Sequence, residues 1–305
     1  HTEAVAWVAG RAELISTLFY LLSFLTFMKR HYIYSVLCFL LALLCKESAL
    51  SLPLIIIAYD VFFSHGFTRI KLKSQTRLNS NPWLKYLPYF LLCLIYLIIR
   101  INVLGSIGPV GKFQYLHRFD IPTKVFLALK AFAYYVRLTI FPFNLSIYYA
   151  LSPSSPGVIS AFFILGILIY LAFKSFYKQR SFSFSLCWFL LTLLPFSNIV
   201  PIGTLVAERL LYLPSVGFCL ILALFALKFA KPSRGMIIFS VIFALYSIQT
   251  LNRNIVFNNE IALWQDEVRK FPKHASPHSA LAKAYYDSGF LEEALDEYQL
   301  AHNIA

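Results

Sequence analysis

The chain has few charged residues and none of the short motifs that identify most soluble enzymes. Only 13% of its 305 residues are Asp, Glu, Lys or Arg, against roughly 25% in an ordinary soluble domain. It contains no P-loop, Gly-rich dinucleotide turn, nucleophile elbow or HExxH sequence, so the corresponding nucleotide, hydrolase and metalloprotease sites are not predicted. The five cysteines lack metal-ligand spacing, and neither a metal site nor a disulfide framework is expected from them.

Long apolar runs dominate what is present. Hydrophobic residues make up 59% of the chain, and the mean hydropathy is +0.68. Uncharged apolar runs of roughly 18 residues are typical of transmembrane helices. We therefore predict an all-α fold in which a polytopic transmembrane bundle occupies residues 1–252. The apolar runs cover approximately 12–28, 32–45, 48–63, 86–104, 124–141, 157–173, 182–199, 210–227 and 236–250.

The net charge of +13 is concentrated in short loops between these runs. Basic loops are typical of the cytoplasmic side of a membrane protein, so this charge favours a membrane topology over binding of nucleic acid. The loops 105–122, 142–156 and 199–209 are expected on the opposite, outer side. Four basic loops are expected in the cytoplasm. Their basic residues are Lys29 and Arg30; Arg69, Lys71, Lys73, Arg77 and Lys85; Lys174, Lys178 and Arg180; and Lys228, Lys231 and Arg234.

One run does not fit a simple alternation of sides. The segment 124–141 lies between two loops that are both expected outside. It carries Lys130, Tyr134 and Arg137 on one helical face, which is typical of an interfacial or re-entrant helix. If the segment spans the membrane instead, every later segment changes sides.

The tail 253–305 is polar and has the pattern of a tetratricopeptide repeat, a 34-residue helical hairpin. We predict that a repeat domain begins here and that Leu281, Tyr285 and Tyr298 are its candidate protein-binding residues. A single repeat does not bury its own apolar face, so further repeats are expected after Ala305. Counted from Ala275, the matching residues are Leu281, Ala282, Tyr285, Gly289, Ala294, Tyr298 and Ala301.

Ionisable residues within the apolar segments are the candidate functional groups, because they are costly in a membrane. Arg11 begins a span, Lys46 and Glu47 interrupt continuous apolar sequence, and Glu208 with Arg209 interrupts another run. Arg and Lys at an outer cavity are suited to holding a lipid phosphate by charge-assisted hydrogen bonds. The alternative is that these residues are simply helix-end or interfacial charges.

Several phrases occur in a characteristic order: HTEAVAWVAGRAE, CKES, KAFAYYVRLTIFPFNLS and VAERLLYLPSVGF, followed by the repeat. Over essentially the whole chain this order resembles the transmembrane and tetratricopeptide-repeat-containing (TMTC) family and its bacterial relatives, which are GT-C glycosyltransferases. The resemblance implies transfer of a sugar, mannose in that family, from a polyprenyl- or dolichyl-phosphate donor to protein Ser/Thr hydroxyls. It also implies that the reaction takes place at the periplasmic or luminal face, where the repeats bind acceptor proteins.

The resemblance assigns supporting residues but no catalytic base. In GT-C enzymes the catalytic acidic residue lies in the first outer loop, which is expected upstream of His1, so the chain is expected to be an N-terminally truncated piece that is inactive alone. Whether a metal takes part is not predicted. The candidate donor-phosphate ligands are Arg11, Lys46, Arg137 and Arg209, with Glu47 and Glu208 orienting them.

Two other functions fit the same composition. The chain is also consistent with a non-catalytic membrane scaffold whose repeats recruit protein partners, or with a transporter built on broken helices. No inverted repeat is evident between its halves, which disfavours the transporter. An acidic residue in an outer loop upstream of His1 would favour the enzyme over the scaffold.

Overall fold

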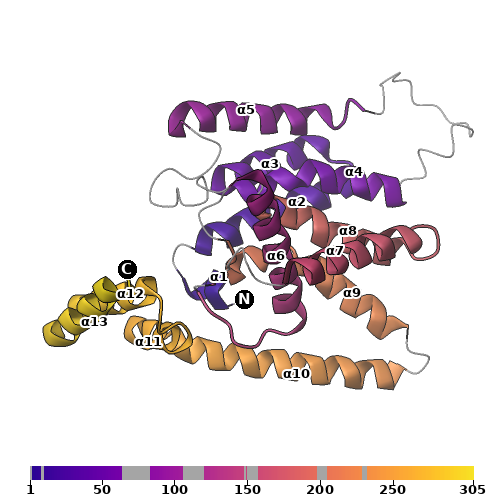
Figure 1. Cartoon of the computed structure of the whole chain (residues 1–305). Coiled ribbons are helices and arrows are strands. Elements are labelled where there is room, and N and C mark those ends of the chain that lie inside the picture. Colours follow the sequence, from indigo (N-terminus) through magenta and orange to yellow (C-terminus); the bar gives the residue numbers. More distant parts are fainter. Residues whose placement is uncertain are drawn as a thin grey trace, which may run out of the picture.

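The computed structural model describes residues 2–7, 10–63, 83–105, 120–147, 149, 157–197, 205–228 and 232–305. Every regular element within these ranges is a helix, which confirms the all-α prediction (Figure 1). The α-helices are α1 (Thr2–Ala6), α2 (Arg11–Met28), α3 (Tyr32–Cys45), α4 (Leu52–Phe63), α5 (Leu87–Leu104), α6 (Ile121–Ile140), α7 (Gly157–Lys174), α8 (Arg180–Leu193), α9 (Ser215–Leu227), α10 (Pro232–Val256), α11 (Glu260–Lys270), α12 (Ala275–Asp287) and α13 (Leu291–Ile304).

The helices follow the predicted apolar runs closely, but two runs are interrupted. Residues 48–63 start as the 3₁₀ helix Glu47–Ser51 and become α-helical only at Leu52. The run 210–227 likewise begins in the 3₁₀ helix Glu208–Leu211, and α9 begins only after Pro214. Because proline lacks an amide N–H, it is tolerated in or just before the first turn of a helix and marks such breaks.

The chain passes back and forth between two ends of the bundle. At one end, here called the basic end, the last turn of α4 and the turns that follow α7 and α9 lie close together: Lys228 Nζ donates to Gln179 Oε1 at 2.7 Å, and Arg180 Nη1 donates to the Phe62 carbonyl at 3.5 Å. The opposite end, here called the tail end, holds α1, both 3₁₀ helices described above and α11 (Figure 1). Several predicted loop residues lie outside the described part: His1, Arg69, Lys71, Lys73, Arg77 and Lys231.

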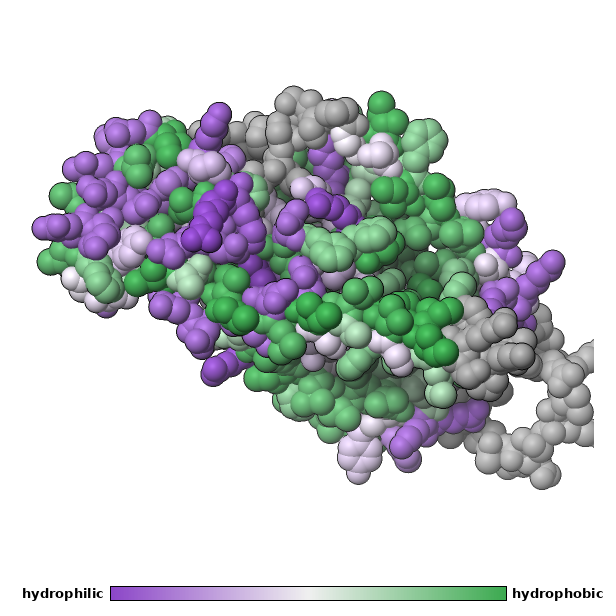
Figure 2. Space-filling model, turned by 90° about the horizontal axis from the view of Figure 1, so that it is seen from below, coloured by the Kyte–Doolittle hydropathy of each residue, from purple (hydrophilic) through white to green (hydrophobic). Residues whose placement is uncertain are grey.

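The surface is that of a membrane protein. Among the described residues, three helices are long and apolar enough to cross a membrane: α2, α7 and the part of α10 at Gly235–Val256. Large apolar side chains such as Ile99, Phe162 and Phe243 are exposed on α5, α7 and α10. Figure 2, seen from the side of α10, shows a hydrophobic surface on the bundle and a mainly hydrophilic surface over the tail. The number of spans and the sides on which their ends lie remain predictions.

Helix α6 runs across the direction shared by α5 and α10 (Figure 1). Of the three residues predicted to share one face, Lys130 is buried and Arg137 is exposed, with Tyr134 between these extremes. The guanidinium of Arg137 lies 5.4 Å from the ring centroid of Tyr134. The crosswise direction agrees with an interfacial helix, and its place in the membrane stays a prediction.

Small polar side chains join the central helices within the apolar core. Ser23 on α2 donates to the Ser35 carbonyl on α3 at 2.7 Å, and Tyr89 on α5 donates to Ser35 Oγ at 2.6 Å. In a bilayer, packing of small residues and hydrogen bonds hold helices together, since lipid tails are as apolar as the core. An aromatic cluster that includes Tyr20, Phe24 and Trp188 fills the space beside them. This rigid centre fixes the helix ends that form the site.

The tail starts inside a helix. Helix α10 continues to Val256, so the predicted domain boundary between residues 252 and 253 falls within it. The next helix, α11, is capped at its N-terminus by Asn259, whose Oδ1 accepts from the Ile261 amide at 2.9 Å. A turn at Gly289, with φ of 87°, joins α12 and α13, a left-handed conformation for which glycine is preferred. This helix pair agrees with the predicted tetratricopeptide pattern, and the repeat assignment remains a prediction.

Candidate functional site

The tail end collects the charged residues that lie between apolar segments. Four of the six predicted donor-site residues, Lys46, Glu47, Glu208 and Arg209, lie there, and each forms an ion pair. In all four pairs the partner comes from a different element of the chain. The site is therefore built from several helix ends and not from one motif.

Lys46 is neutralised by a carboxylate from α2. It ends α3 with an extended backbone, and its Nζ lies 2.5 Å from Oε2 of Glu13, whose side chain is fully buried. The adjacent Glu47 lies 3.5 Å from Arg100 Nη1 on α5, and Arg100 also donates to the Tyr96 hydroxyl at 3.0 Å. The two charged residues that interrupt the apolar sequence, Lys46 and Glu47, are thus paired with residues of two different helices, α2 and α5.

Arg209 is neutralised from the N-terminal helix. Its Nη1 lies 2.5 Å from Oε1 of Glu3, and its amide donates to Oε2 of the same carboxylate at 3.0 Å. Glu3 is fully buried. The guanidinium also lies over the ring of Trp7, 5.5 Å from its centroid, a cation–π arrangement. One carboxylate therefore fixes both the backbone and the side chain of Arg209.

Glu208, the neighbour of Arg209, is buried and faces the tail. Its Oε1 accepts from the Tyr149 hydroxyl at 2.9 Å and lies 3.6 Å from Arg253 Nη2. Burial raises the pKa of Glu208 to about 7, although Arg253 and the Tyr149 hydroxyl favour the charged form. Burial also raises the pKa of Tyr149, so this hydroxyl remains protonated and acts as the donor.

The other two predicted donor ligands lie apart from these pairs. Arg11 is exposed at the start of α2, and Arg137 is exposed on α6. Within the described residues neither makes an ion pair, and Arg137 lies over Tyr134 instead. Among the described residues, neither shares a contact with Lys46 or Arg209, so their role as donor ligands stays a prediction.

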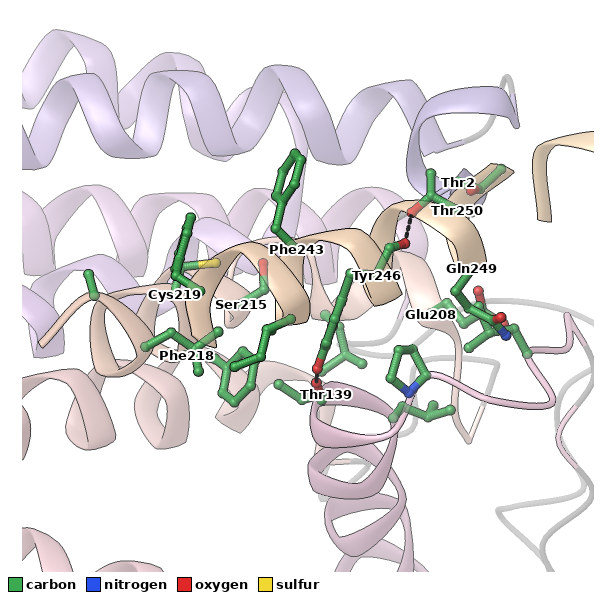
Figure 3. Close-up of a pocket in the computed structure, with 18 residues that line it drawn as sticks. Thr2, Thr139, Glu208, Ser215, Phe218, Cys219, Phe243, Tyr246, Gln249 and Thr250 are labelled. Carbon is green, nitrogen blue, oxygen red and sulfur yellow. Dashed lines mark hydrogen bonds between the residues drawn. The ribbon is translucent and has the colours of Figure 1, made fainter. Parts of the chain in front are cut away.

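An apolar cavity of about 400 Å³ lies next to Glu208. Its walls come mainly from α9 and α10, with Phe218, Leu222 and Phe243 among the lining side chains. At one end the lining is polar, with Glu208, Gln249 and Thr250, and Figure 3 shows these side chains gathered away from Phe218 and Cys219. A cavity that is apolar along its length and polar at one end is suited to an amphipathic molecule whose apolar chain lies between α9 and α10.

Tyr246 closes the side of the cavity towards α6. Its hydroxyl donates to the carbonyl of Thr139 at 2.7 Å (Figure 3) and lies 3.1 Å from that of Ile140. Both carbonyls belong to the last turn of α6, where helix carbonyls lack partners within the helix. The cavity wall is thus attached to the end of the crosswise helix.

The three residues predicted to bind proteins differ in exposure. Leu281 is buried, and Tyr285 is partly buried and accepts from Gln265 Nε2 at 2.9 Å. Tyr298 on α13 is exposed. Of the three, Tyr298 is therefore the side chain available to a partner in this structure, while the other two pack within the tail.

Sequence reasoning placed Glu3 and Glu13 near the outer face but did not predict which residues pair with the candidate ones. Glu3 pairs with Arg209, Glu13 with Lys46, and Tyr149 and Arg253 with Glu208. The only sequence signal was their type, since each is a polar residue near an apolar run, and the partners lie up to 206 positions apart. Within the described ranges, no group of three or more His, Cys, Asp or Glu residues is arranged to hold a metal ion.

Comparisons with known proteins point to one group of relatives. The chain is 26% identical to protein O-mannosyl-transferase TMTC3 of Mus musculus, over all of the chain and 37% of that protein. It is 29% identical to protein O-mannosyl-transferase F38B6.6 of Caenorhabditis elegans, over 98% of the chain and 43% of that protein. A shorter stretch, 38% of the chain, is 36% identical to protein O-mannosyl-transferase Tmtc2 of Drosophila melanogaster and covers 13% of it.

The chain thus spans about two fifths of the length of the curated relatives that it matches from end to end. No family model matches it, and no solved structure shows a significant match.

Proposed function

Because the homologues of this chain are TMTC-family protein O-mannosyl-transferases, we propose that it is the membrane and early tail region of a glycosyltransferase that adds mannose to proteins. The observation that carries this proposal is the similarity along the whole chain to several such transferases. The fold agrees with it, since a helical membrane bundle continues directly into a helical tail.

The donor that fits the site is mannose linked to a polyprenyl or dolichyl phosphate. The apolar cavity between α9 and α10 has room for the first part of such a lipid chain, and its polar end lies at Glu208. Arg209 does not line the cavity, but its partner Glu3 follows Thr2, which does, and a guanidinium is suited to a phosphate. We propose that the phosphate competes with the Glu3 carboxylate for Arg209 and with the Glu13 carboxylate for Lys46.

The tail would receive the acceptor. We propose that the hydroxyl of an acceptor Ser or Thr approaches at the tail end and that the repeats beginning at α12 hold the acceptor protein, with exposed Tyr298 as a contact. The tail end would then be the periplasmic or luminal side. A general base must take the hydroxyl proton as the sugar carbon is attacked, and we assign this role to no described residue, because Glu3 and Glu13 are buried in ion pairs.

The proposal is tested by measuring the rate at which mannose is released from its lipid-phosphate donor. The full-length protein is reconstituted with polyprenyl-phosphate-mannose and an acceptor protein, and the wild type is compared with the paired variants Glu13→Gln/Lys46→Met and Glu3→Gln/Arg209→Met. Both partners are removed together because a buried charge left without its partner would itself destabilise the protein by about 3–5 kcal/mol. Each paired variant is expected to lose roughly ten- to hundredfold in kcat/KM for the donor, because a charged phosphate contact is lost.

A matched ion pair at the basic end provides the control. Lys85 Nζ lies 2.5 Å from Asp60 Oδ2, and the variant Asp60→Asn/Lys85→Met should turn over normally. Normal turnover in both tail-end paired variants would show that these cations do not bind the donor.

The alternative is a non-catalytic scaffold, and the ion pairs favour it in one respect. Both Lys46 and Arg209 are already neutralised by fully buried carboxylates, as expected of charges that only join helix ends. A scaffold would release no mannose from any of several lipid-linked donors, while still binding proteins through its tail.

A further inference from the structure

We propose that Arg253 is a positioning residue of this site: it holds α10, α11, residues 145–147 and Tyr149 against Glu208 and thereby fixes the location of Arg209. The proposal rests on the proposed function, because it concerns how the donor-phosphate ligand is kept in place. The same contacts of Arg253 join the tail to the membrane bundle, and this structural link is expected whether or not the chain transfers a sugar.

Arg253 is buried at the last turns of α10 and faces three carboxylates. Its Nη1 donates to Asp266 Oδ2 at 3.1 Å, and its Nη2 lies 3.6 Å from Glu208 Oε1 and 3.7 Å from Glu267 Oε1. The guanidinium also lies 5.0 Å from the ring centroid of Phe257. Asp266 and Glu267 belong to α11, and Glu208 belongs to the bundle. One planar cation therefore joins the tail to the bundle.

Helix α11 also holds residues 145–147, through Glu267 and Lys270. The buried Glu267 accepts from the Ser146 hydroxyl and, through Oε1, from the Ile147 amide at 3.0 Å. Lys270 lies 2.5 Å from Asp266 Oδ2 and donates to the Leu145 carbonyl at 2.5 Å. These contacts anchor the irregular segment, whose backbone groups would otherwise lack partners.

The segment in turn reaches Glu208. Tyr149 accepts from the Ser146 amide at 2.9 Å and donates to Glu208 Oε1 at 2.9 Å. Glu208 therefore receives contacts from both Arg253 and the segment that α11 holds. Glu208 and Arg209 are consecutive in a single 3₁₀ helix, so a displacement of Glu208 also moves the amide and guanidinium of Arg209 away from Glu3.

The shape of the arginine side chain is what this arrangement requires. Its two terminal nitrogens face different carboxylates at the same time, whereas a lysine offers a single point charge on a flexible stem. Arg253→Lys keeps the charge that balances the carboxylates and removes the planar fork. This variant separates the positioning role from the need for a buried cation, which a neutral substitution would not do.

The test combines kinetics with amide exchange in the full-length protein. Arg253→Lys is expected to lower kcat/KM for polyprenyl-phosphate-mannose by about tenfold, the worth of one charge-assisted hydrogen bond, at an unchanged melting temperature. Amide exchange in residues 205–211 is expected to become about tenfold faster. The control is Arg269→Lys, the same substitution at an exposed position of α11, which should leave both measurements at wild-type values.

The two measurements separate the two proposals. Unchanged exchange in residues 205–211 of Arg253→Lys would overturn the positioning role of Arg253, whatever the kinetics. Faster exchange in a protein whose wild type turns over no lipid-linked sugar would establish the structural link and reject the transferase. Combining Arg253→Lys with Glu208→Gln should add no further loss to that of either variant, and fully additive losses would also overturn the proposal.

Discussion

At the residue scale, the site consists of buried charges that are neutralised by partners distant in the sequence. Lys46 and Arg209 were recognisable as charges in apolar sequence, but Glu13 and Glu3 were not recognisable as their partners. A buried ion is costly unless it is paired, so the presence of these pairs follows from physics. Their identity does not, because it depends on which helix ends meet.

Glu208 provides a prediction about pH. Burial raises its pKa from the ordinary value of a glutamate side chain to about 7, so between these two values the folded state binds more protons than the unfolded state. Its contribution to stability is complete below the ordinary glutamate pKa and is lost as the pH rises through 7. The difference between the two pKa values corresponds to about 3 kcal/mol.

The measurement is the melting temperature of the wild type and of Glu208→Gln in detergent between pH 4.5 and 8. The wild type is expected to become less stable over this interval, and the variant is expected to show a clearly smaller decrease because its amide does not titrate. Parallel curves for the two proteins would show that Glu208 does not titrate in this interval.

At the element scale, the apolar runs predicted nearly every helix of the bundle, and local breaks within these runs were harder to place. The predicted run 210–227 is helical only from Ser215, because residues 208–214 contain the ion-paired 3₁₀ helix and Pro214. The sequence showed that Glu208 and Arg209 interrupt the run, but the distribution of apolar residues does not give the length of such a break. The crosswise direction of α6 also depends on tertiary packing.

The contact between α8 and α9 gives a prediction at this scale. A Cβ atom on Gly217 would lie 2.6 Å from the Ser185 carbonyl oxygen and 2.9 Å from the Phe189 amide nitrogen. Gly217→Ala should therefore force α9 away from α8 and destabilise the protein by about 1–3 kcal/mol. Thermal unfolding in detergent measures this effect.

Gly166 in α7 is the matched control, because a Cβ atom there meets nothing within 4 Å. Both substitutions carry the same gain in helix propensity, about 1 kcal/mol, so the comparison isolates the steric clash. Equal melting temperatures for the two variants would mean that α8 and α9 do not approach as closely as described.

At the scale of the whole molecule, the chain sorts its charges between two ends. The described basic turns lie at one end, and the ion-paired site and the tail lie at the other. The positive-inside rule predicts that the basic end is cytoplasmic and the tail end is periplasmic or luminal. The sequence suggested this arrangement from loop charges alone, but the sides depend on whether α6 spans the membrane.

Cysteine labelling in sealed vesicles tests the sides directly. Lys178 in the turn after α7 and Lys273 before α12 are both exposed, and the native cysteines lie within helices α3, α5, α8 and α9. In a background without these cysteines, an impermeant maleimide is expected to label Lys178→Cys and Lys273→Cys from opposite sides. Labelling of both from one side would mean that one of α8, α9 and α10, the bundle helices between the two positions, does not cross the membrane.

The most direct test of the central claim is the mass of an acceptor protein after incubation with the reconstituted full-length protein and polyprenyl-phosphate-mannose. The account predicts an acceptor that gains hexose on Ser or Thr, with the gain strongly reduced in Glu3→Gln/Arg209→Met and retained in Asp60→Asn/Lys85→Met. An acceptor that binds the tail but gains no hexose from any lipid-linked donor would contradict the transferase and favour the scaffold.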